Sequence, residues 1–438
     1  MGLKALMFYK KTLHDFDVNG KKILLRADYN VPLTDEGEIE SNFRITQSLP
    51  TIRALQERGC KVVICSHLGR PSGPDDAKFS LRPVAKELEK LLGQKVTFVD
   101  DCVGDQVKHA TNDMQAGDVV LLENLRFHPE EENNDEQFAR ALVESTGAEV
   151  FVQDGFGVVH RAHASTDAVA RIIPAVAGLL LAKEVDTITE AIHNPTRPLM
   201  AIIGGAKIED KIDIIYKFLD IADIVIIGGA MANTFLKAQG VEVGDSLYDE
   251  GELDTAHNII DKVREICAHR KLIFYLPQDG IVATEIAKDA HTRIVDWDAH
   301  FIATVESYPK KPTATSGKVK KHEKILDIGP FSAAFISGAM QLCGTVVWNG
   351  TMGVSETPAL RGPIGPFAHG TEAIMDSIVG KYGNRPFSVV GGGDTAAYVE
   401  ARGMNDMFSH VSTGGGASLE LMAGKDLPGV SVLWDKEG

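Results

Sequence analysis

The sequence predicts an α/β protein made of two doubly wound, parallel-sheet (Rossmann-like) domains joined by a helical hinge. Three observations support this fold: the length of 438 residues, a series of short apolar runs rich in Val and Ile, and helix-like segments between those runs. A single hydrophobic core rarely grows beyond ~250–300 residues, so the length alone favours two domains.

The apolar runs do not alternate with polar residues, which is typical of strands buried on both faces of a parallel sheet. In the first half they read KILLRADYN, KVVICSHLG, DVVLLENLRF and VFVQDGFG. In the second half they read LMAIIGGAK, IVIIGGAM, LIFYLPQDG, TVVWNGTMG and FSVVGGGDT. Helical patterns separate them, and repeated strand–helix–strand order predicts one doubly wound sheet in each half.

The domain boundary is expected at the helix-like segment LLLAKEVDTITEAIHN, which ends at the turn signal Asn194-Pro195. We therefore predict an N-terminal domain over residues 1–190 and a C-terminal domain over residues 191–425. A lysine-rich stretch, residues 310–324, is set in a Pro/Thr/Ser/Gly context and is expected to be a solvated surface loop.

Composition narrows the function. The formal net charge of −16 disfavours a nucleic-acid binder, whose affinity depends on neutralising phosphates. No apolar run approaches the ~20 residues needed to span a bilayer, and the short apolar stretch in MGLKALMFYKK does not read as a signal peptide. The five cysteines are scattered, which suggests reduced thiols and a cytoplasmic location.

The first half places cationic and amide side chains just beyond the predicted strands. In open parallel sheets, ligands bind at the carboxyl ends of the strands, and arginine presents a forked donor suited to phosphate and carboxylate. We interpret this set as a pocket for a small, highly anionic molecule, although separate surface arginines with their own partners would give the same pattern. The candidate residues are Asp28, Asn30, Arg44, His67, Arg70, Arg126, His160, Arg161 and His163.

The second half instead places glycines after its strands. Glycines ahead of helices allow backbone N–H groups to approach phosphate, and the helix N-terminus favours negative charge. A four-residue spacing on one expected helix would put Lys207 and Lys211 on the same face. A single such turn would be an ordinary strand-to-helix connection, but four of them favour a nucleotide polyphosphate site. The glycine-rich turns are 204–206, 228–230, 391–395 and 414–418.

Several familiar enzyme classes are disfavoured. The sequence has no GxxxxGK[ST] motif of P-loop proteins, no GxGxxG with an acidic partner in the first βα turn, no HRD…DFG set and no GxSxG.

The segments RADYNVP, SHLGRP, LLENLRFHPEEENND, HRAHAS, GGAKIEDK, WNGTMGVSE and GGGDT resemble, in order, the signature segments of phosphoglycerate kinases. The resemblance extends from about residue 21 to residue 427. It implies two α/β domains joined by a helix, with a C-terminal tail of about residues 426–438 returning to the first domain. It also implies transfer of a phosphoryl group between 1,3-bisphosphoglycerate and ADP, giving 3-phosphoglycerate and ATP, with Mg²⁺ carried by the nucleotide and the enzyme acting as a monomer.

The resemblance assigns roles to residues of both halves. It places phosphoglycerate on Asp28, Asn30, Arg44, His67, Arg70, Arg126 and Arg161, and it places the catalytic groups at Arg44, Lys211, Gly393 and Gly416. Glu356 is expected to hold the ribose hydroxyls, and Asp394 is expected to meet the magnesium of the nucleotide. The nucleotide side as a whole comprises Gly205, Ala206, Lys207, Lys211, Gly229, Asn349, Glu356, Gly391, Gly392, Gly393, Asp394 and Thr395.

The acceptor carboxylate of 3-phosphoglycerate is ionised at neutral pH, so no general base is needed, and none is apparent in the motifs. Two alternatives remain: a silent nucleotide-binding protein with this fold, and an NAD-dependent dehydrogenase. The chain departs from the family pattern at Thr351, where proline is usual, at Ser355, where an aromatic is common, and in DGFGVVHR. Residues 310–324 and 361–366 also look longer than usual, so we expect weak discrimination between nucleotide bases.

Overall fold

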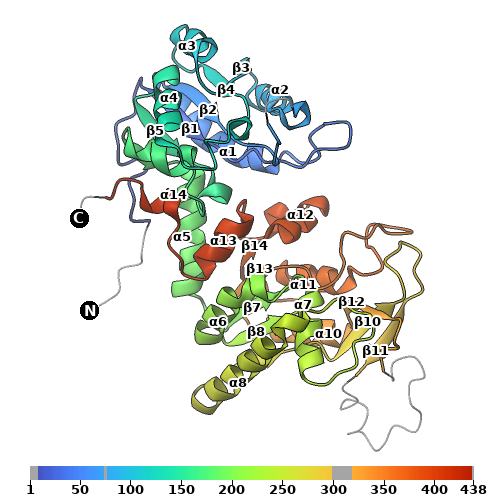
Figure 1. Cartoon of the computed structure of the whole chain (residues 1–438). Helices are drawn as coiled ribbons and strands as arrows, with labels where there is room; N and C mark the ends of the chain where they lie inside the picture. The colour runs from blue at the N-terminus through green and yellow to red at the C-terminus, as the bar shows by residue number, and fades with distance from the viewer. Residues whose placement is uncertain (1–7, 74–75, 298–317, 437–438) are drawn as a thin grey trace, which may run out of the picture. The chain divides into compact units, whose positions relative to one another are not determined.

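The computed structural model describes residues 8–73, 76–297 and 318–436 (Figure 1). The chain divides into two compact units: Met1–Thr189 together with Thr413–Gly438, and Glu190–Ser412. The division falls within helix α5 (Leu179–His193), the segment expected to connect the domains. The chain enters the first unit again at Thr413, whereas the boundary expected from the sequence lay at residue 425.

The first unit is built on a six-stranded sheet in the order β3-β4-β2-β1-β5-β6, with every neighbouring pair parallel. Strands β1, β2, β4 and β5 are the four predicted from apolar runs, and nearly all of their residues are buried. The bounds are β1 (Lys22–Arg26), β2 (Lys61–Cys65), β3 (Val96–Val99), β4 (Val119–Leu122), β5 (Val150–Gln153) and β6 (Ala175–Ala177).

Helices connect these strands and cover the sheet (Figure 1). The apolar face of α1 buries Ile45, Leu49, Ile52 and Leu55 in the same core as the residues of β1 and β2. Helices α2 and α4 both end at a glycine in the left-handed conformation, Gly93 and Gly147, as helix stop signals predict. The helices of this unit, besides α5, are α1 (Phe43–Glu57), α2 (Arg82–Leu92), α3 (Asp105–Asn112), α4 (Glu136–Thr146), α13 (Gly415–Met422) and α14 (Pro428–Ser431).

The C-terminal segment contacts the N-terminal part of the first unit. Lys10 and Asp435 form an isolated antiparallel bridge and an ion pair. The N–H of Gly429, in α14, donates to the carbonyl of Val159 at 2.9 Å. The packing of α13 against the 3₁₀ turn Phe156–Val158 explains why residues 413–425 belong to this unit.

The second unit repeats the plan with the order β15-β14-β13-β7-β8-β9, again all parallel. All five apolar runs predicted for this half form strands, namely β7, β8, β9, β13 and β14. The bounds are β7 (Leu199–Ile203), β8 (Ile224–Ile227), β9 (Ile273–Tyr275), β13 (Thr345–Asn349), β14 (Phe387–Gly391) and β15 (His410–Val411); the helices are α6 (Ile212–Ile221), α7 (Gly229–Ala238), α8 (Leu253–His269), α10 (Pro330–Met340), α11 (His369–Ile378) and α12 (Gly393–Ala401).

A small antiparallel sheet in the second unit has no counterpart in the sequence prediction. It pairs β10 (Asp279–Ala283) with β11 (Arg293–Asp296) and β12 (Lys324–Ile328). Part of the lysine-rich stretch, residues 310–317, lies outside the described residues. Its last residue, Lys324, begins β12 rather than ending a loop, and Arg293 of β11 forms an ion pair with Glu323 beside it.

Candidate functional site

Two strand edges carry the predicted site residues, one in each unit. In the first unit, Arg26 of β1 stands in register with Cys65 of β2 and Gln153 of β5. The loops that follow these parallel strands therefore leave the sheet at the same edge. This places Asp28, His67 and the turn before Arg161 together.

Asp28, Asn30 and Arg44 form one hydrogen-bonded group. Arg44 is the second residue of α1, and its Nη1 lies 3.1 Å from both carboxylate oxygens of Asp28 and 3.1 Å from the carbonyl of Asn30. The Asn30 N–H donates to Asp28 Oδ1 at 3.1 Å. Burial acts to raise the pKa of Asp28, but Arg44, with a smaller contribution from Arg26, holds it below its usual value.

His67 is buried beneath this group and is neutral. Burial is the main cause of its pKa lying well below the usual value. Asp28 acts to raise this pKa, whereas the cations Arg26, Arg126 and Arg44 lower it further. An Nη2 nitrogen of Arg26 lies 3.3 Å from His67 Nδ1. Since guanidinium can only donate, Nδ1 is the acceptor and Nε2 carries the proton of the neutral ring.

Arg126 is held by two contacts to its own unit. Its Nη1 donates to the carbonyl of Gly69 at 2.7 Å, and its Nε lies 3.0 Å from Glu132. Asn124 ties the two loops together, because its side chain accepts from the Leu68 N–H and donates to the Leu68 carbonyl. Gly69 itself has φ +61°, and a Cβ there would lie 2.2 Å from the Phe79 ring, so this turn requires glycine.

Arg161 and two histidines extend the positive region. Arg161 Nε donates to His160 Nε2 at 3.1 Å. Burial, followed by neighbouring arginines, lowers the pKa of His160 and brings that of His163 to about 4. Gly416, in the first turn of α13, also lies here: a Cβ at that position would stand 3.0 Å from His160 Nε2. Gly416 thus belongs to the unit of the arginines, although its sequence position suggested the glycine-rich half.

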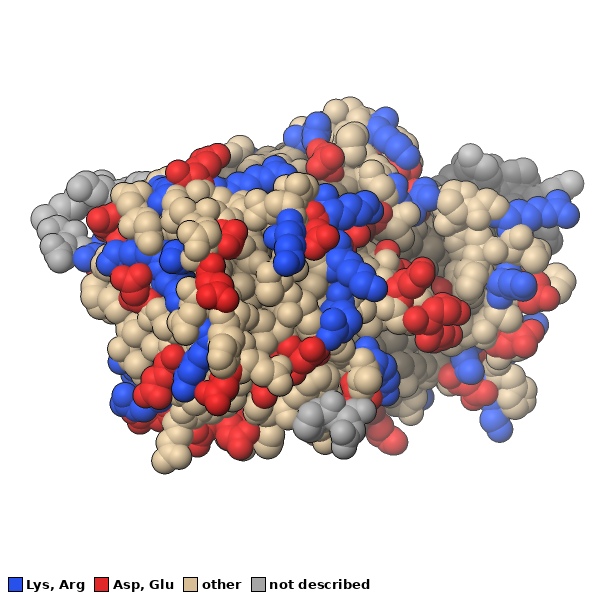
Figure 2. Space-filling view, turned by 90° about the horizontal axis from the view of Figure 1, so that it is seen from above, with Lys and Arg blue, Asp and Glu red and all other residues tan. Residues whose placement is uncertain are grey.

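The electrostatic result is a local excess of positive charge on an acidic protein. Burial is the main cause that lowers the pKa of Arg126; Arg161 and Arg26 add to it, and Glu132 opposes it. Arg70 follows the same loop and is exposed. By contrast, on the face drawn in Figure 2, Lys and Arg side chains are interspersed with Asp and Glu.

The sequence prediction missed a buried network next to these cationic residues. Arg26 is 1% exposed; its Nε donates to Ser165 Oγ at 2.8 Å, and its Nη2 lies 4.0 Å from Glu131. Glu131 accepts from both the Ser165 hydroxyl at 2.6 Å and the Ser165 N–H at 2.9 Å. The available signal was the charged residue inside KILLRADYN, because a buried strand rarely carries an arginine without a specific partner.

In the second unit, three glycine turns meet at the edge formed by β7, β8 and β13. A Cβ on Gly229 would lie 2.5 Å from backbone atoms of Gly205, and one on Gly350 would lie 2.2 Å from the Gly204 carbonyl. These glycines are therefore required by backbone-to-backbone packing. Gly393 differs, because a Cβ there would meet nothing within 4 Å, so the space above it is open to a ligand.

Lys211 and Asn349 lie together at this edge. Lys211 Nζ donates to Asn349 Oδ1, and Asn349 is the last residue of β13. Asn349 Nδ2 is buried and has no hydrogen-bond partner, which leaves a donor available for a ligand. Burial lowers the pKa of Lys211 to about 8, against the opposing effects of Asp210 and Asp394.

The expected common helix face of Lys207 and Lys211 does not form. Lys207 precedes a 3₁₀ turn (Glu209–Lys211), and α6 begins only at Ile212. The prediction failed because a four-residue spacing implies a shared face only within a continuous helix. Lys207 and Ala206 are exposed, and Lys211 is partly buried.

Helix α12 contributes the remaining candidates. Gly391 ends β14 in register with Asn349, and Gly392, with φ +91°, caps a helix that begins at Gly393. Asp394 is exposed in the first turn, and Thr395 is buried with its Oγ1 accepting from the Gly350 N–H at 2.7 Å. Glu356 is exposed on the loop after β13.

The same chain matches known proteins over nearly its whole length. A sequence model of phosphoglycerate kinase matches residues 13–425. The phosphoglycerate kinase of Moorella thermoacetica is 46% identical over 98% of this chain and 100% of that protein, and that of Pelotomaculum thermopropionicum is 45% identical over the same shares.

Solved structures agree with the sequence comparisons. The phosphoglycerate kinase of Coxiella burnetii has a TM-score of 0.77 at 36% identity, covering 97% of this chain and 98% of that one. The phosphoglycerate kinase of Pyrococcus horikoshii has a TM-score of 0.76 at 29% identity, with the same coverage. The chain therefore belongs to the phosphoglycerate kinase family.

Proposed function

We propose that this protein is a phosphotransferase that moves a phosphoryl group reversibly between 1,3-bisphosphoglycerate and ADP, giving 3-phosphoglycerate and ATP. The observation that carries the proposal is the full-length identity of about 45% to curated phosphoglycerate kinases. The reaction belongs to glycolysis and gluconeogenesis.

The first unit would bind the phosphoglycerate. Arg44, Arg126 and Arg161 supply guanidinium groups, and Arg70 supplies an exposed one. Asp28 and Asn30 would orient the hydroxyl, and neutral His67 offers an Nε2–H donor. This division suits a ligand that combines phosphate and carboxylate with an uncharged hydroxyl.

The second unit would bind the nucleotide. Lys211 and the N-terminus of α12 would bind the phosphates, and the buried, unpartnered Nδ2 of Asn349 would offer a further donor. Gly205, Ala206, Lys207, Gly229, Gly391, Gly392 and Thr395 complete the phosphate-facing loops, and exposed Glu356 would receive the ribose hydroxyls.

Magnesium would enter with the nucleotide. Exposed Asp394 fits this role because Mg²⁺ prefers one or two carboxylates together with substrate phosphates. When bound, the ion neutralises charge on the phosphates. The positive field of the first unit would do the same for the acyl phosphate.

Catalysis requires alignment and charge stabilisation rather than proton transfer. The acceptor carboxylate is ionised at neutral pH, and the histidines of the pocket are neutral. Phosphoryl transfer passes through a loose transition state whose charge spreads over the peripheral oxygens. Arg44, Lys211 and the N–H groups at Gly393 and Gly416 are the proposed stabilising groups.

We further propose that the enzyme acts in the cytoplasm as a monomer. All five cysteines are free thiols, which suits a reducing compartment. Among the described residues, no helix has the length and apolar character to cross a bilayer.

The test is formation of ATP from ADP and enzymatically generated 1,3-bisphosphoglycerate. We expect multiple turnovers that depend on Mg²⁺. The Lys211→Ala variant serves as the matched control for contaminating kinase. Tight nucleotide binding with no turnover would instead identify a catalytically silent protein of this family.

A further inference from the structure

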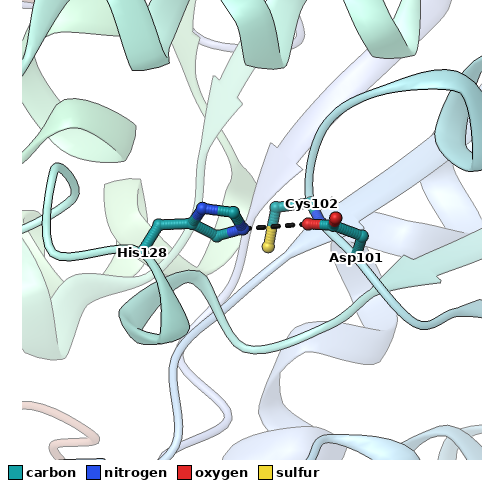
Figure 3. A group of neighbouring side chains, drawn as sticks. All are labelled: Asp101, Cys102 and His128. Carbon is teal, nitrogen blue, oxygen red and sulfur yellow. Dashed lines mark hydrogen bonds and ion pairs between the residues drawn. The ribbon is translucent and has the colours of Figure 1, made fainter. Parts of the chain in front are cut away.

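Three metal-ligating side chains converge in the first unit outside the phosphoglycerate pocket: Asp101, Cys102 and His128 (Figure 3). Each offers one ligand atom, and these atoms all lie within 4.8 Å of one another. We propose that Asp101, Cys102 and His128 form a binding site for a divalent transition ion of the Zn²⁺ class, with water as the fourth ligand.

The fold brings these residues together through neighbouring parallel strands. Asp101 and Cys102 follow β3, and His128 follows β4 and the 3₁₀ turn Leu125–Phe127. Because β3 and β4 pair in parallel, their following loops leave the same edge of the sheet. The site is therefore fixed by the sheet and does not depend on a long flexible segment.

The ligand atoms are already oriented toward one another. His128 Nε2 and Asp101 Oδ1 are 2.9 Å apart. The Asp101 carboxylate also accepts from the Cys102 N–H at 2.6 Å, and Cys102 Sγ lies 3.0 Å from the Glu123 carbonyl. The His128 ring is braced by Phe138, with ring centroids 5.0 Å apart.

The spacing suits tetrahedral zinc. Zn–S, Zn–N and Zn–O bonds of about 2.0–2.3 Å place tetrahedral ligand atoms roughly 3.4–3.6 Å apart. The present separations, from 2.9 Å to at most 4.8 Å, therefore need adjustments of roughly 1 Å. A bound metal ion would take the place of the hydrogen bond between His128 and Asp101, and these two ligand atoms would then move apart to the tetrahedral spacing.

The chemical types of the three ligands and their exposure to solvent indicate which ion would bind and how many ligands it would have. A thiolate, an imidazole and a carboxylate form a mixed set that suits Zn²⁺ and disfavours Mg²⁺, which prefers oxygen. Cys102 is 1% exposed, whereas the side chains of His128 and Asp101 are 29% and 43% exposed. The open side lies next to the nitrogen and oxygen ligands, so a metal ion can enter there and keep a water.

The charge around the site favours a cation. With a thiolate, Asp101 and Cys102 would balance the two positive charges of the ion. Cys102 Sγ lies beside the backbone of Glu123, and the Glu123 carboxylate accepts from Ser80 Oγ at 2.6 Å and from the Leu81 N–H at 2.8 Å. A further negative charge held close to the sulfur strengthens the attraction for a dication.

The experiment uses the full chain freed of metal by chelation, in excess Mg²⁺, with Co²⁺ as the spectroscopic probe and Zn²⁺ as the competitor. We expect one Co²⁺ per chain, with thiolate-to-cobalt charge-transfer absorption that Zn²⁺ abolishes. The Cys102→Ala variant should lose this absorption. Since loss of a supporting residue alone costs a metal site about 10–100-fold in affinity, His128→Gln should weaken Zn²⁺ binding at least about tenfold.

Two control variants separate this site from surface binding. Cys267→Ala removes the exposed thiol of α8, and His109→Gln removes an exposed histidine of α3; both should bind as wild type. Because Cys102 is buried, His128→Gln, which changes a partly exposed side chain, decides the case if Cys102→Ala does not fold. The proposal is overturned if wild type shows no charge-transfer absorption or if Cys267→Ala loses it. An unchanged Zn²⁺ affinity in His128→Gln would also overturn it.

Discussion

Arg44 Nη1 is equidistant from the two carboxylate oxygens of Asp28, at 3.1 Å from each. The guanidinium is partly exposed, with 25% of its side chain accessible, whereas Asp28 is 6% exposed. Asp28 therefore holds the cation in place from the buried side, while part of the Arg44 side chain stays open to solvent. We expect a ligand anion to reach this exposed part without first breaking the pair.

The Arg44→Ala variant should fold and lose most of its turnover. A cation used mainly in the transition state lowers kcat more than it weakens ground-state binding. By analogy with arginine fingers, we expect kcat to fall about 10³-fold. Steady-state kinetics measure this, with Arg53→Ala as the control because Arg53 is exposed on the same helix. An Arg44→Ala enzyme within about threefold of wild type would contradict the role.

The pH profile should report the charge on Lys211. Its pKa in the free protein is about 8, so the ammonium is lost as pH rises through 8. We expect kcat/KM for nucleotide to fall about tenfold per pH unit above that value. Bound phosphate favours the charged form, so the alkaline limb of kcat should lie at higher pH. In Lys211→Arg, whose guanidinium stays charged, activity should be lower and the alkaline limb absent; an unchanged limb would assign it to another group.

Lys211→Ala should damage catalysis more than Asn349→Ala. Lys211 directs a charge at the transferred group, whereas Asn349 orients that lysine through Oδ1 and offers a single neutral donor. We expect Lys211→Ala to lower kcat and Asn349→Ala to act mainly on KM for nucleotide. The reverse order in parallel assays would mean that the phosphate assignment is wrong.

The sequence predicted nine strands of the two parallel sheets because most of them are dense, buried Val/Ile runs, but it missed β3, β6, β15 and the small antiparallel sheet, whose runs are shorter or partly exposed. It predicted the edge residues because parallel strands end at one edge. It could not predict the helix boundary at Ile212, where a 3₁₀ turn separates Lys207 from Lys211. It also assigned the glycine turn 228–230 to the nucleotide site. Close backbone packing by itself requires Gly229, and this is visible only when the loops are placed side by side.

Two further features depend on tertiary contacts. Gly416 lies beside His160 of the first unit, although more than 250 residues separate them in the sequence. The sequence did not predict the buried pair of Arg26 and Glu131, because the recognisable motifs lie at strand ends and Arg26 lies within a strand. Local patterns thus identified the elements, and long-range packing determined which loops share an edge.

Asp154 should make stability depend on pH below neutrality. Asp154 follows β5, and its buried side chain reaches the first turn of α5. Its Oδ1 accepts from the Leu180 N–H at 2.9 Å, while its Oδ2 has no hydrogen-bond partner. Burial raises its pKa from 3.8 to about 7, against hydrogen bonds that lower it. A raised pKa means that the folded state binds the proton more tightly, so this contribution is complete below the unfolded value and is lost as pH rises toward 7.

The Asp154→Asn variant keeps an Oδ1 acceptor and removes the titration. In wild type, the free energy of unfolding should contain a contribution that declines by about 1.4 kcal/mol per pH unit as pH rises from 4 to 7. This contribution should be absent from Asp154→Asn. Urea unfolding of wild type and variant across that range measures the difference. Asp113→Asn, at an exposed position after α3, is the control. Parallel curves for wild type and Asp154→Asn would show that Asp154 does not carry the dependence.

Thr351 gives the most specific prediction about nucleotide choice. From the sequence alone, threonine in place of proline suggested a looser turn and weak discrimination between bases. In the structure, Thr351 Oγ1 donates to the Gly353 carbonyl at 3.1 Å, and the neighbouring Met352 N–H donates to Thr371 Oγ1 at 3.0 Å. Proline at position 351 would remove the first of these hydrogen bonds, because it has no hydroxyl, whereas the second comes from Met352 and would remain.

We still expect the enzyme to favour ATP over GTP by less than about a hundredfold, or roughly 2.7 kcal/mol. Small shape differences in an apolar pocket give only ~1–3 kcal/mol of discrimination, and the phosphate contacts are the same for both nucleotides. Comparing kcat/KM for ATP and GTP measures the preference in wild type, in Thr351→Pro and in Thr351→Val, which removes only the hydroxyl. If the hydroxyl shapes the turn, both variants should shift the ratio in the same direction. If only the backbone restriction of proline matters, Thr351→Val should match wild type and Thr351→Pro should not. A wild-type preference above a hundredfold, or an unchanged ratio in both variants, would remove Thr351 from any account of base selection.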